Sequence, residues 1–512
     1  MALAKTIMIQ GTSSHVGKSL LCTALCRIFK QDGFLVAPFK AQNMALNSYV
    51  TLDGGEIGRA QGAQAEAAGV TATVQMNPVL LKPKQDLQAQ VVVLGKPLAD
   101  MSARDYRQHF LPRAVNLVEH CLQELRQDYD VLVIEGAGSP AEVNLKDRDI
   151  VNMRTAMLAE APVILAADID RGGVFASIVG TLELLEPRER QKVAGFIINK
   201  FRGDLELLRP GLEFLELRTG KPVLGVIPYL HGHGIEEEDS VSLDGAQRTQ
   251  AGADLDIAVI QLPRISNFTD FDLLSRVPGA ALRFVGAGDA LGQPDAVIIP
   301  GTKNTVSDLL YLREKGLDKE ILALVQRGTP LAGICGGYQM MGKMLYDPRG
   351  TEAGMGSLPG LGLLDIETTF LAEKQTHRCS ATISHRGLHW CHAAHREIEG
   401  YEIHTGQVEF GRDAEPLLTI TRRSGASTHL PDGAAAQQGQ IFGTHLHGFF
   451  DNTGLLLDWV NYLRKLKGRS LLAAEQMPVH RDEKYDRLAA EVRRHLDMDK
   501  LYKMMGLGES RA

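Results

Sequence analysis

The nine residues Gly11-Thr-Ser-Ser-His-Val-Gly-Lys-Ser19 decide the fold of the first part of the chain. They follow the apolar run Thr6-Ile-Met-Ile-Gln10 and precede a helix-like stretch at residues 20–30. A strand, a glycine-rich loop and a helix in this order allow backbone N–H groups to surround a phosphate. The segment therefore predicts a phosphate-binding loop in an α/β domain.

This loop has five residues between its bracketing glycines, whereas the ordinary pattern has four. Its ending, Gly17-Lys-Ser19, is intact, so we expect Lys18 to hold the β- and γ-phosphates of a nucleotide. The hydroxyl of Ser19 is then within reach of Mg²⁺. The nucleotide-binding residues that we predict are Gly11, Thr12, Gly17, Lys18, Ser19 and, at the end of a later strand-like run, Asn199.

Carboxylates near this loop are candidate metal ligands. Glu135 stands at the tip of an apolar run, residues 131–134, where it is placed to be the acidic partner of the metal. Asp53 and Glu56 could add contacts to metal or substrate, but an ordinary surface carboxylate explains each of them equally well.

Apolar, β-branched runs alternate with helical patterns through the first part of the chain. Such alternation predicts a mostly parallel sheet covered by helices on both faces, with the chemistry at the carboxyl ends of the strands. The alternation resumes after residue 254, and residues 362–420 are poorer in helical pattern. The strand-like runs of the first part are residues 5–10, 35–39, 129–134, 162–167, 193–198 and 222–227.

The chain divides where the alternation stops, in a stretch rich in Gly, Ser, Asp, Glu and Gln. We expect an ATP-binding domain at residues 1–232 and a linker at 233–253. A second α/β domain follows at 254–452, and a helical C-terminal extension at 453–512.

A cysteine stands on a second glycine-bracketed turn, Gly333-Ile-Cys-Gly-Gly337, between a strand-like and a helix-like segment. This is the cysteine form of a nucleophile elbow, and the helix dipole lowers the pKa of a thiol at that position. Cys335 is therefore the predicted nucleophile. The backbone N–H of Gly336 and the glycine loop at Gly301 are the predicted oxyanion donors.

The base that serves this cysteine should be a histidine distant in sequence. His445 and His447 follow a strand-like run, residues 440–443, and are the best candidates. His404 is a weaker candidate.

Composition excludes several classes of function. The net charge of −7 and the lack of a basic, aromatic stripe give no sign of a nucleic-acid partner. No apolar run approaches the roughly 20 residues that span a bilayer, so we expect no membrane partner. The six cysteines form no paired metal-binding spacing and are expected to be reduced thiols of a cytoplasmic protein. The oligomeric state stays open.

Taken together, these motifs match a known family. The segment Gly333-Ile-Cys-Gly-Gly-Tyr-Gln339 with the late Leu446-His-Gly448 resembles the class I (triad) glutamine amidotransferase domain. The first loop with Glu135-Gly-Ala-Gly138 resembles the phosphate loop of the dethiobiotin synthetase type. Both together are similar to the cobyrinic and cobyric acid amide synthases of cobalamin (vitamin B12) biosynthesis. The segments that carry this likeness are residues 42–50, 55–61, 76–83, 135–142, 168–175, 199–204 and 263–270.

The resemblance implies two doubly wound α/β domains, one P-loop NTPase-like and one class I glutamine amidotransferase-like. It implies ATP and Mg²⁺ as cofactors and L-glutamine and a corrinoid as substrates. The reaction expected from it is amidation of the b, d, e and g carboxylates of adenosylcobyrinic acid a,c-diamide. ATP would convert each acid to an acyl phosphate, and ammonia released from glutamine at Cys335 would displace the phosphate.

One residue departs from the wider amidotransferase pattern. By resemblance, His447 is the partner of Cys335, but Phe449 stands where a glutamate usually lies two residues after the histidine. The group that orients His447 is therefore left open, and a two-residue Cys–His site is an alternative.

A polycarboxylate substrate calls for polar and cationic groups near the phosphate site. Lys40, Asn43, Asn47, Arg59 and Lys82 are candidates, and each could equally be an ordinary structural residue. Two other functions stay open: the sister reaction that makes the a,c-diamide, and a ParA-like ATPase scaffold. The scaffold leaves Cys335 and His447 unexplained.

Overall fold

The chain forms two compact units that differ from the divisions expected from sequence. The computed structural model describes residues 3–85, 88–230, 233–235, 253–352, 356–384, 388–392, 395–478 and 481–508. Unit 1 comprises residues 1–45, 56–236 and 480–512, and unit 2 comprises residues 46–55 and 237–479. Most of the predicted linker, 233–253, lies outside the described residues.

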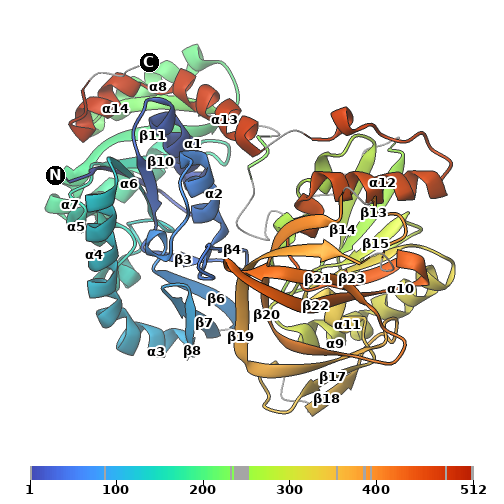
Figure 1. The fold of residues 1–512 in the computed structure, drawn as a ribbon. Coiled ribbons are helices and arrows are strands. Elements are labelled where there is room, and N and C mark those ends of the chain that lie inside the picture. Colours follow the sequence, from blue (N-terminus) through green and yellow to red (C-terminus); the bar gives the residue numbers. More distant parts are fainter. Residues whose placement is uncertain are drawn as a thin grey trace. The chain divides into compact units, whose positions relative to one another are not determined.

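Unit 1 is built on a six-stranded sheet in which every neighbouring pair is parallel (Figure 1). All six strand-like runs of the first part of the chain are strands of this sheet, which confirms the predicted parallel α/β fold. In the order in which they pair, the strands are β12 (Val223–Pro228), β11 (Val193–Phe201), β10 (Val163–Asp168), β1 (Lys5–Gly11), β9 (Val131–Glu135) and β2 (Val36–Phe39).

Helices and a smaller sheet complete unit 1. The smaller sheet contains β3 (Gln42–Met44), β6 (Val79–Gln85), β7 (Gln88–Val93) and β8 (Lys96–Ser102). A further short strand is β5 (Glu56–Gly58), and a π-helix spans Tyr106–Phe110. The α-helices are α1 (Lys18–Gln31), α2 (Arg59–Ala68), α3 (Ala103–Asp105), α4 (Leu111–Asp128), α5 (Met153–Leu158), α6 (Val174–Leu184), α7 (Pro187–Lys192), α8 (Leu205–Thr219), α13 (Arg481–His495) and α14 (Met498–Met505).

Unit 2 is built on a mixed sheet of eleven strands. Five neighbouring strands are parallel: β14 (Ala280–Val285), β13 (Leu255–Ile260), β15 (Ala296–Ile299), β16 (Leu331–Ile334) and β23 (Ile441–Thr444). The sheet continues through mainly antiparallel pairs: β22 (Ala426–Ala436), β21 (Pro416–Arg423), β19 (Ile366–Ile383), β20 (Glu397–Phe410), β17 (Met344–Asp347) and β18 (Gly356–Pro359).

This antiparallel part accounts for the stretch that lacks helical pattern, because β19 and β20 form one long ladder there. Unit 2 also contains the short strand β4 (Ser48–Val50) and the 3₁₀ turns η5 (Phe268–Phe271) and η9 (Phe449–Asp451). Its α-helices are α9 (Thr305–Lys315), α10 (Leu317–Gln326), α11 (Gly336–Met340) and α12 (Thr453–Leu466).

The C-terminal helices belong to different units because each buries its apolar face in a different core. In α12, Leu456 and Trp459 lie in the core of unit 2. In α13 and α14, Tyr485 and Tyr502 lie in the core of unit 1. The expected extension at 453–512 is therefore divided between the two units. Among the described residues, none of the helices combines the length and the apolar character that crossing a bilayer requires.

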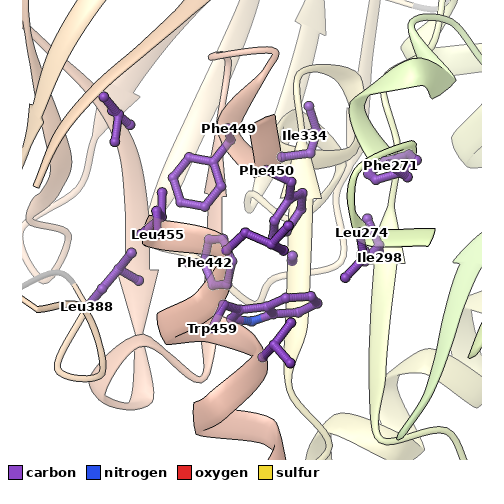
Figure 2. Packing of buried hydrophobic residues seen from close by; sticks show 14 of the residues in the cluster. Phe271, Leu274, Ile298, Ile334, Leu388, Phe442, Phe449, Phe450, Leu455 and Trp459 are labelled. Carbon is purple, nitrogen blue, oxygen red and sulfur yellow. The ribbon is translucent and has the colours of Figure 1, made fainter. Parts of the chain in front are cut away.

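One core cluster of unit 2 contains several aromatic rings among aliphatic side chains (Figure 2). The rings of Phe450 and Trp459 lie 4.8 Å apart, and those of Phe449 and Phe450 are 5.4 Å apart in a T-shaped contact. Phe271 and Ile334 belong to the same cluster. Because these residues adjoin Asp270, Cys335 and His447 in the sequence, one packed core fixes the backbone around all three.

We expect Leu456→Ala to lower the free energy of unfolding of unit 2 by about 2–5 kcal/mol, since the side chain is fully buried. Both tryptophans, Trp390 and Trp459, lie in unit 2, so urea unfolding followed by tryptophan fluorescence reports on this unit. Leu466→Ala is the control, because Leu466 ends the same helix and is 57% exposed. Equal midpoints for the two variants would contradict the packing described for α12.

Candidate active sites

The predicted phosphate loop joins β1 to α1 in unit 1. Gly17, which precedes the helix, has φ 96°, a conformation that favours glycine. A Cβ atom there would lie 2.3 Å from Nδ2 of Asn199. That Nδ2 donates a hydrogen bond of 2.7 Å to the carbonyl of Val16. Asn199, at the carboxyl end of β11, therefore holds the loop in place through this side-chain hydrogen bond.

Lys18 turns back over this loop. Its Nζ donates to the carbonyls of Ser13, at 3.1 Å, and Gly138, at 3.2 Å. Gly11 is confined by the same loop, because a Cβ atom there would lie 2.6 Å from Val16 and 3.0 Å from Lys18 Nζ. The ammonium thus lies between the loop and the Gly138 segment, where a phosphate on the loop would meet it.

Ser19 and Glu135 lie together, as predicted for metal ligands. The Ser19 hydroxyl donates to Glu135 Oε1 at 2.8 Å, and the same oxygen accepts from Lys40 Nζ at 2.8 Å. Gln64 Nε2 donates to the other carboxylate oxygen at 2.6 Å. Burial by itself raises the pKa of Glu135, but the charge and hydrogen bonds of Lys40, with Gln64 and Ser19, hold it below its ordinary value.

A hydroxyl and an ionised carboxylate are the oxygen ligands that Mg²⁺ takes beside phosphate and water. Ser19 and Glu135 therefore fit this ion. Asp53 lies in unit 2, where its carboxylate accepts the hydroxyl of Thr51, and its role as a metal ligand stays a prediction.

The polar residues predicted to meet the acid substrate are buried and have partners in the protein. Lys40 pairs with Glu135, and Lys82 pairs with Glu56. Asn43 Nδ2 donates to Gln61 Oε1 at 2.9 Å. Arg59 is buried at the start of α2, and Asn47 belongs to unit 2. Burial and protein partners are also what a purely structural role requires, so the roles of these side chains toward substrate stay predictions.

Unit 1 contains a cavity of about 560 Å³. Gly138 lines it and also binds Lys18 through its carbonyl. Its wall is largely apolar and carries charged side chains of both signs, with Lys146 paired to Glu189 at 2.8 Å. The charged lining residues are Arg107, Lys146, Glu142, Asp149 and Glu189. Among its apolar lining residues are Met44, Leu81, Val91, Met101 and Leu111.

Cys335 occupies a strained backbone position between β16 and α11, with φ 50° and ψ −109°. A non-glycine residue rarely takes this conformation, and such strain concentrates at functional sites. The turn is packed too tightly for side chains beside it: a Cβ atom at Gly337 would lie 2.0 Å from the carbonyl of Ile299. This is the geometry predicted for a nucleophile elbow.

The two predicted oxyanion donors lie on either side of this cysteine. A Cβ atom at Gly336 would lie 3.2 Å from the backbone nitrogen of Thr302, the residue after Gly301. One at Gly301 would lie 2.9 Å from the His447 ring and 3.6 Å from Cys335 Cβ. The two loops thus converge on the space beside the sulfur.

His447 is oriented by Asp270, a residue that the sequence analysis missed. His447 Nδ1 bonds to Asp270 Oδ2 at 2.7 Å, and the N–H of Gly448 donates to Asp270 Oδ1 at 3.0 Å. Burial lowers the pKa of His447, but the negative charges of Asp270 and Cys335 and their hydrogen bonds outweigh burial and raise it to about 10. His447 therefore lies between a carboxylate and the sulfur, and Asp270 occupies the third position of a triad.

The other two candidate histidines are held by other groups. His445 Nδ1 bonds to Asp432 at 2.7 Å, and its Nε2 lies 3.1 Å from Gln339 Nε2. The His404 ring stacks on His445 at 4.0 Å, and burial lowers its pKa. This arrangement favours His447 as the partner of Cys335.

Asp270 is the last residue of Pro263-Arg-Ile-Ser-Asn-Phe-Thr-Asp270, one of the segments that carry the family resemblance. Nothing in its spacing connected it with His447, 177 positions later. Phe449, where a glutamate was expected, is buried in the aromatic core instead.

Comparisons with known proteins match a different family domain to each part of the chain. The family described as "CobQ/CobB/MinD/ParA nucleotide binding domain" matches residues 7–239. The family described as "CobB/CobQ-like glutamine amidotransferase domain" matches residues 256–455. A "Cobyric acid synthase" of Desulforamulus reducens is 74% identical over 511 residues, covering 100% of both chains. Another of Pelotomaculum thermopropionicum is 53% identical, covering 99% of this chain and 97% of its own.

We expect Asp270→Asn to move the pH dependence of Cys335 alkylation upward by about one pH unit or more. The Asp270 carboxylate raises the pKa of His447, and the His447 cation stabilises a thiolate once the proton has moved from sulfur to the ring. Without that carboxylate, the thiolate forms only at higher pH. The measurement is the iodoacetamide reaction rate of the Cys335 peptide against pH, read by mass spectrometry.

Asp432→Asn is the matched control, since it removes the carboxylate of a second buried Asp–His pair in unit 2. Its alkylation profile should follow the unsubstituted protein. A profile that Asp270→Asn leaves unchanged would show that Asp270 does not govern the charge of the Cys335–His447 pair.

Proposed function

This chain belongs to the cobyric acid synthase family, and from this premise we propose that it joins a glutaminase in unit 2 to an ATP-dependent amide-forming site in unit 1. The family consists of glutamine-hydrolysing ligases of cobalamin biosynthesis. The observation that carries the proposal is the Cys335 elbow with His447 and Asp270, on the same chain as an ordered phosphate loop.

In the glutaminase, the Cys335 thiolate attacks the side-chain amide carbon of glutamine. The N–H groups of Gly336 and Gly301 stabilise the oxyanion. His447 donates a proton to the departing nitrogen, so that ammonia leaves and a γ-glutamyl thioester remains. Water activated by His447 then hydrolyses the thioester and restores the thiol. Asp270 keeps the imidazole oriented and stabilises its cation.

In unit 1, the phosphate loop binds ATP, and Lys18 neutralises the γ-phosphoryl group as it moves to a substrate carboxylate. Ser19 and Glu135 would hold Mg²⁺, which supplies charge neutralisation at the phosphates when bound. The product is an acyl phosphate, which has the leaving group that a free carboxylate lacks. Ammonia displaces the phosphate and forms the amide.

The acids that we propose are the b, d, e and g carboxylates of adenosylcobyrinic acid a,c-diamide. We propose that the corrinoid enters the unit 1 cavity beside Gly138, where apolar side chains suit the macrocycle and Arg107 suits one of its acids. Binding of substrate carboxylates by Lys40, Asn43, Arg59 and Lys82, all of which are buried, stays a proposal. Asn47 and Asp53 lie in unit 2, and direct contact of either with substrate or metal stays a proposal.

The two alternatives have less support. The relatives that match over the whole chain are named cobyric acid synthase, which favours that reaction over the sister a,c-diamide synthesis. A ParA-like scaffold would use the phosphate loop alone. It would give no reason for a strained cysteine beside a buried Asp–His pair.

We expect Cys335→Ser to abolish glutamine-driven amide synthesis and to keep ammonia-driven synthesis within about twofold. A serine hydroxyl remains protonated where the thiol ionises, so it does not attack the amide, whereas unit 1 is untouched. The assay incubates enzyme, ATP, corrinoid acid and either nitrogen source and counts added amides by mass. Normal use of glutamine by this variant would refute the assignment of the nucleophile.

We expect Lys18→Ala to lower amide synthesis from both nitrogen sources by about a hundredfold or more, because the charge opposite the moving phosphoryl group is lost. Cys335 alkylation should not change. Lys30→Ala serves as control, since Lys30 lies at the opposite end of α1, and it should retain synthesis. Ammonia-driven synthesis that survives Lys18→Ala would contradict the role of the loop.

A further inference from the structure

Residues 46–55 interrupt unit 1. The chain leaves unit 1 after Ala45, contributes β4 and its flanks to unit 2, and returns to unit 1 at Glu56. The residues just before this segment include Lys40, which bonds to Glu135 beside the phosphate loop. This segment is therefore a covalent continuation of the proposed nucleotide site that folds as part of the proposed glutaminase unit.

Within unit 2, this segment is hydrogen-bonded to the turn that carries Asp270. The side-chain amide oxygen Oδ1 of Asn47 accepts a hydrogen bond from the N–H of Phe268 at 3.3 Å. The N–H of Ser48 donates to Asn267 Oδ1 at 2.9 Å. Asn47, Ser48 and Asn267 are all nearly inaccessible to solvent.

The bond from Ser48 fixes which way the Asn267 amide points. A backbone N–H only donates, so the Asn267 atom that it meets is the oxygen, and the NH₂ group faces the other way. That NH₂ lies 3.4 Å from His447 Nε2. Because an amide NH₂ also only donates, Nε2 is the acceptor, and the ring is neutral with its proton on Nδ1 toward Asp270.

Asn267 is held in this place at a cost to its backbone. It has φ 52° and ψ 37°, a left-handed conformation that asparagine tolerates better than most residues. Such a conformation persists only where its surroundings enforce it.

The sulfur of Cys335 makes a contact that likewise requires the uncharged form of its group. Its Sγ lies 3.5 Å from the carbonyl oxygen of Ile403, and a carbonyl only accepts, so this contact requires the protonated thiol. Ile403 packs with Val50 of the same segment and with Tyr401. The Tyr401 ring also stacks on His447 at 5.1 Å. Besides their contact with each other, both atoms of the proton transfer thus contact groups that touch residues 46–55.

We propose that residues 46–55 hold the Cys335–His447 pair in its uncharged form through Asn267 and Ile403, so that glutamine hydrolysis depends on movement of a segment continuous with the nucleotide unit. This inference rests on the proposed glutaminase. Asn267 acts here as a positioning residue.

Activation is then a proton transfer with no other reactant. The Asn267 amide leaves Nε2, the S–H proton moves from the Ile403 carbonyl to the line between sulfur and Nε2, the S–H bond breaks and an N–H bond forms. The groups that face His447 are Asp270, Cys335, the Tyr401 ring and Asn267. With Asp270 making the ring basic, release of Nε2 is sufficient to charge the pair.

The test compares three variants of the full chain. Asn267→Gly removes the amide and keeps the left-handed backbone, which glycine adopts freely. Val50→Ala loosens the contact with Ile403. Leu52→Ala is the control in the same segment, since Leu52 is 61% exposed. Two quantities are measured: glutamate release with and without ATP and the corrinoid acid, and the rate of Cys335 alkylation by iodoacetamide at several pH values.

Asn267→Gly and Val50→Ala should each raise glutamate release without ATP and acid by about two- to tenfold, the factor expected when one weak contact that favours the uncharged pair is lost or loosened. They should also move Cys335 alkylation to lower pH, whereas Leu52→Ala should change neither quantity. Unchanged alkylation profiles, or glutamate release that falls equally with and without ATP and acid, would overturn the inference. If the unsubstituted chain releases no glutamate under any condition while Cys335 still alkylates, the proposed glutaminase itself fails.

Discussion

The hydrogen bond between Asp270 and His447 is the constraint on which the glutaminase unit depends. Both groups are almost fully buried, and a buried carboxylate is tolerated only where it is paired. The three residues of the site follow β13, β16 and β23, which are parallel strands of one sheet. Their carboxyl ends meet at one edge, so the sheet brings Asp270, Cys335 and His447 together, and the aromatic core behind them keeps them there.

Local patterns were enough to predict much of this structure. The six strands of the first sheet, the phosphate loop and the cysteine turn are each encoded by fewer than about twelve consecutive residues. A glycine such as Gly17 or Gly337 is required by its own backbone and nearest neighbours, and its effect is visible in the sequence. His447 was also within reach of prediction, because it follows the short strand that pairs with the cysteine strand.

Features that depend on long-range pairing were not predictable in this way. Asp270 has no local signature, since any carboxylate in a loop after a strand has the same appearance in the sequence. Lys40 and Lys82 show the same difficulty: charge alone does not tell a substrate ligand from a buried ion pair. Phe449, in the usual position of the orienting carboxylate, left open whether the site has two residues or takes its carboxylate from another segment, and the structure supplies Asp270.

The strength of the contacts around the thiol bears on how this site is controlled. An ion pair between buried groups resists change, because separating its charges in a low-dielectric interior costs several kcal/mol. The contacts of Asn267 with His447 and of Ile403 with Cys335 are long and involve neutral groups, each worth about 1 kcal/mol. A balance between charged and uncharged forms that rests on such contacts is altered by small shifts of a neighbouring segment. The sequence neighbours of residues 46–55 lie in the nucleotide unit, so this segment is where such a shift would reach the glutaminase.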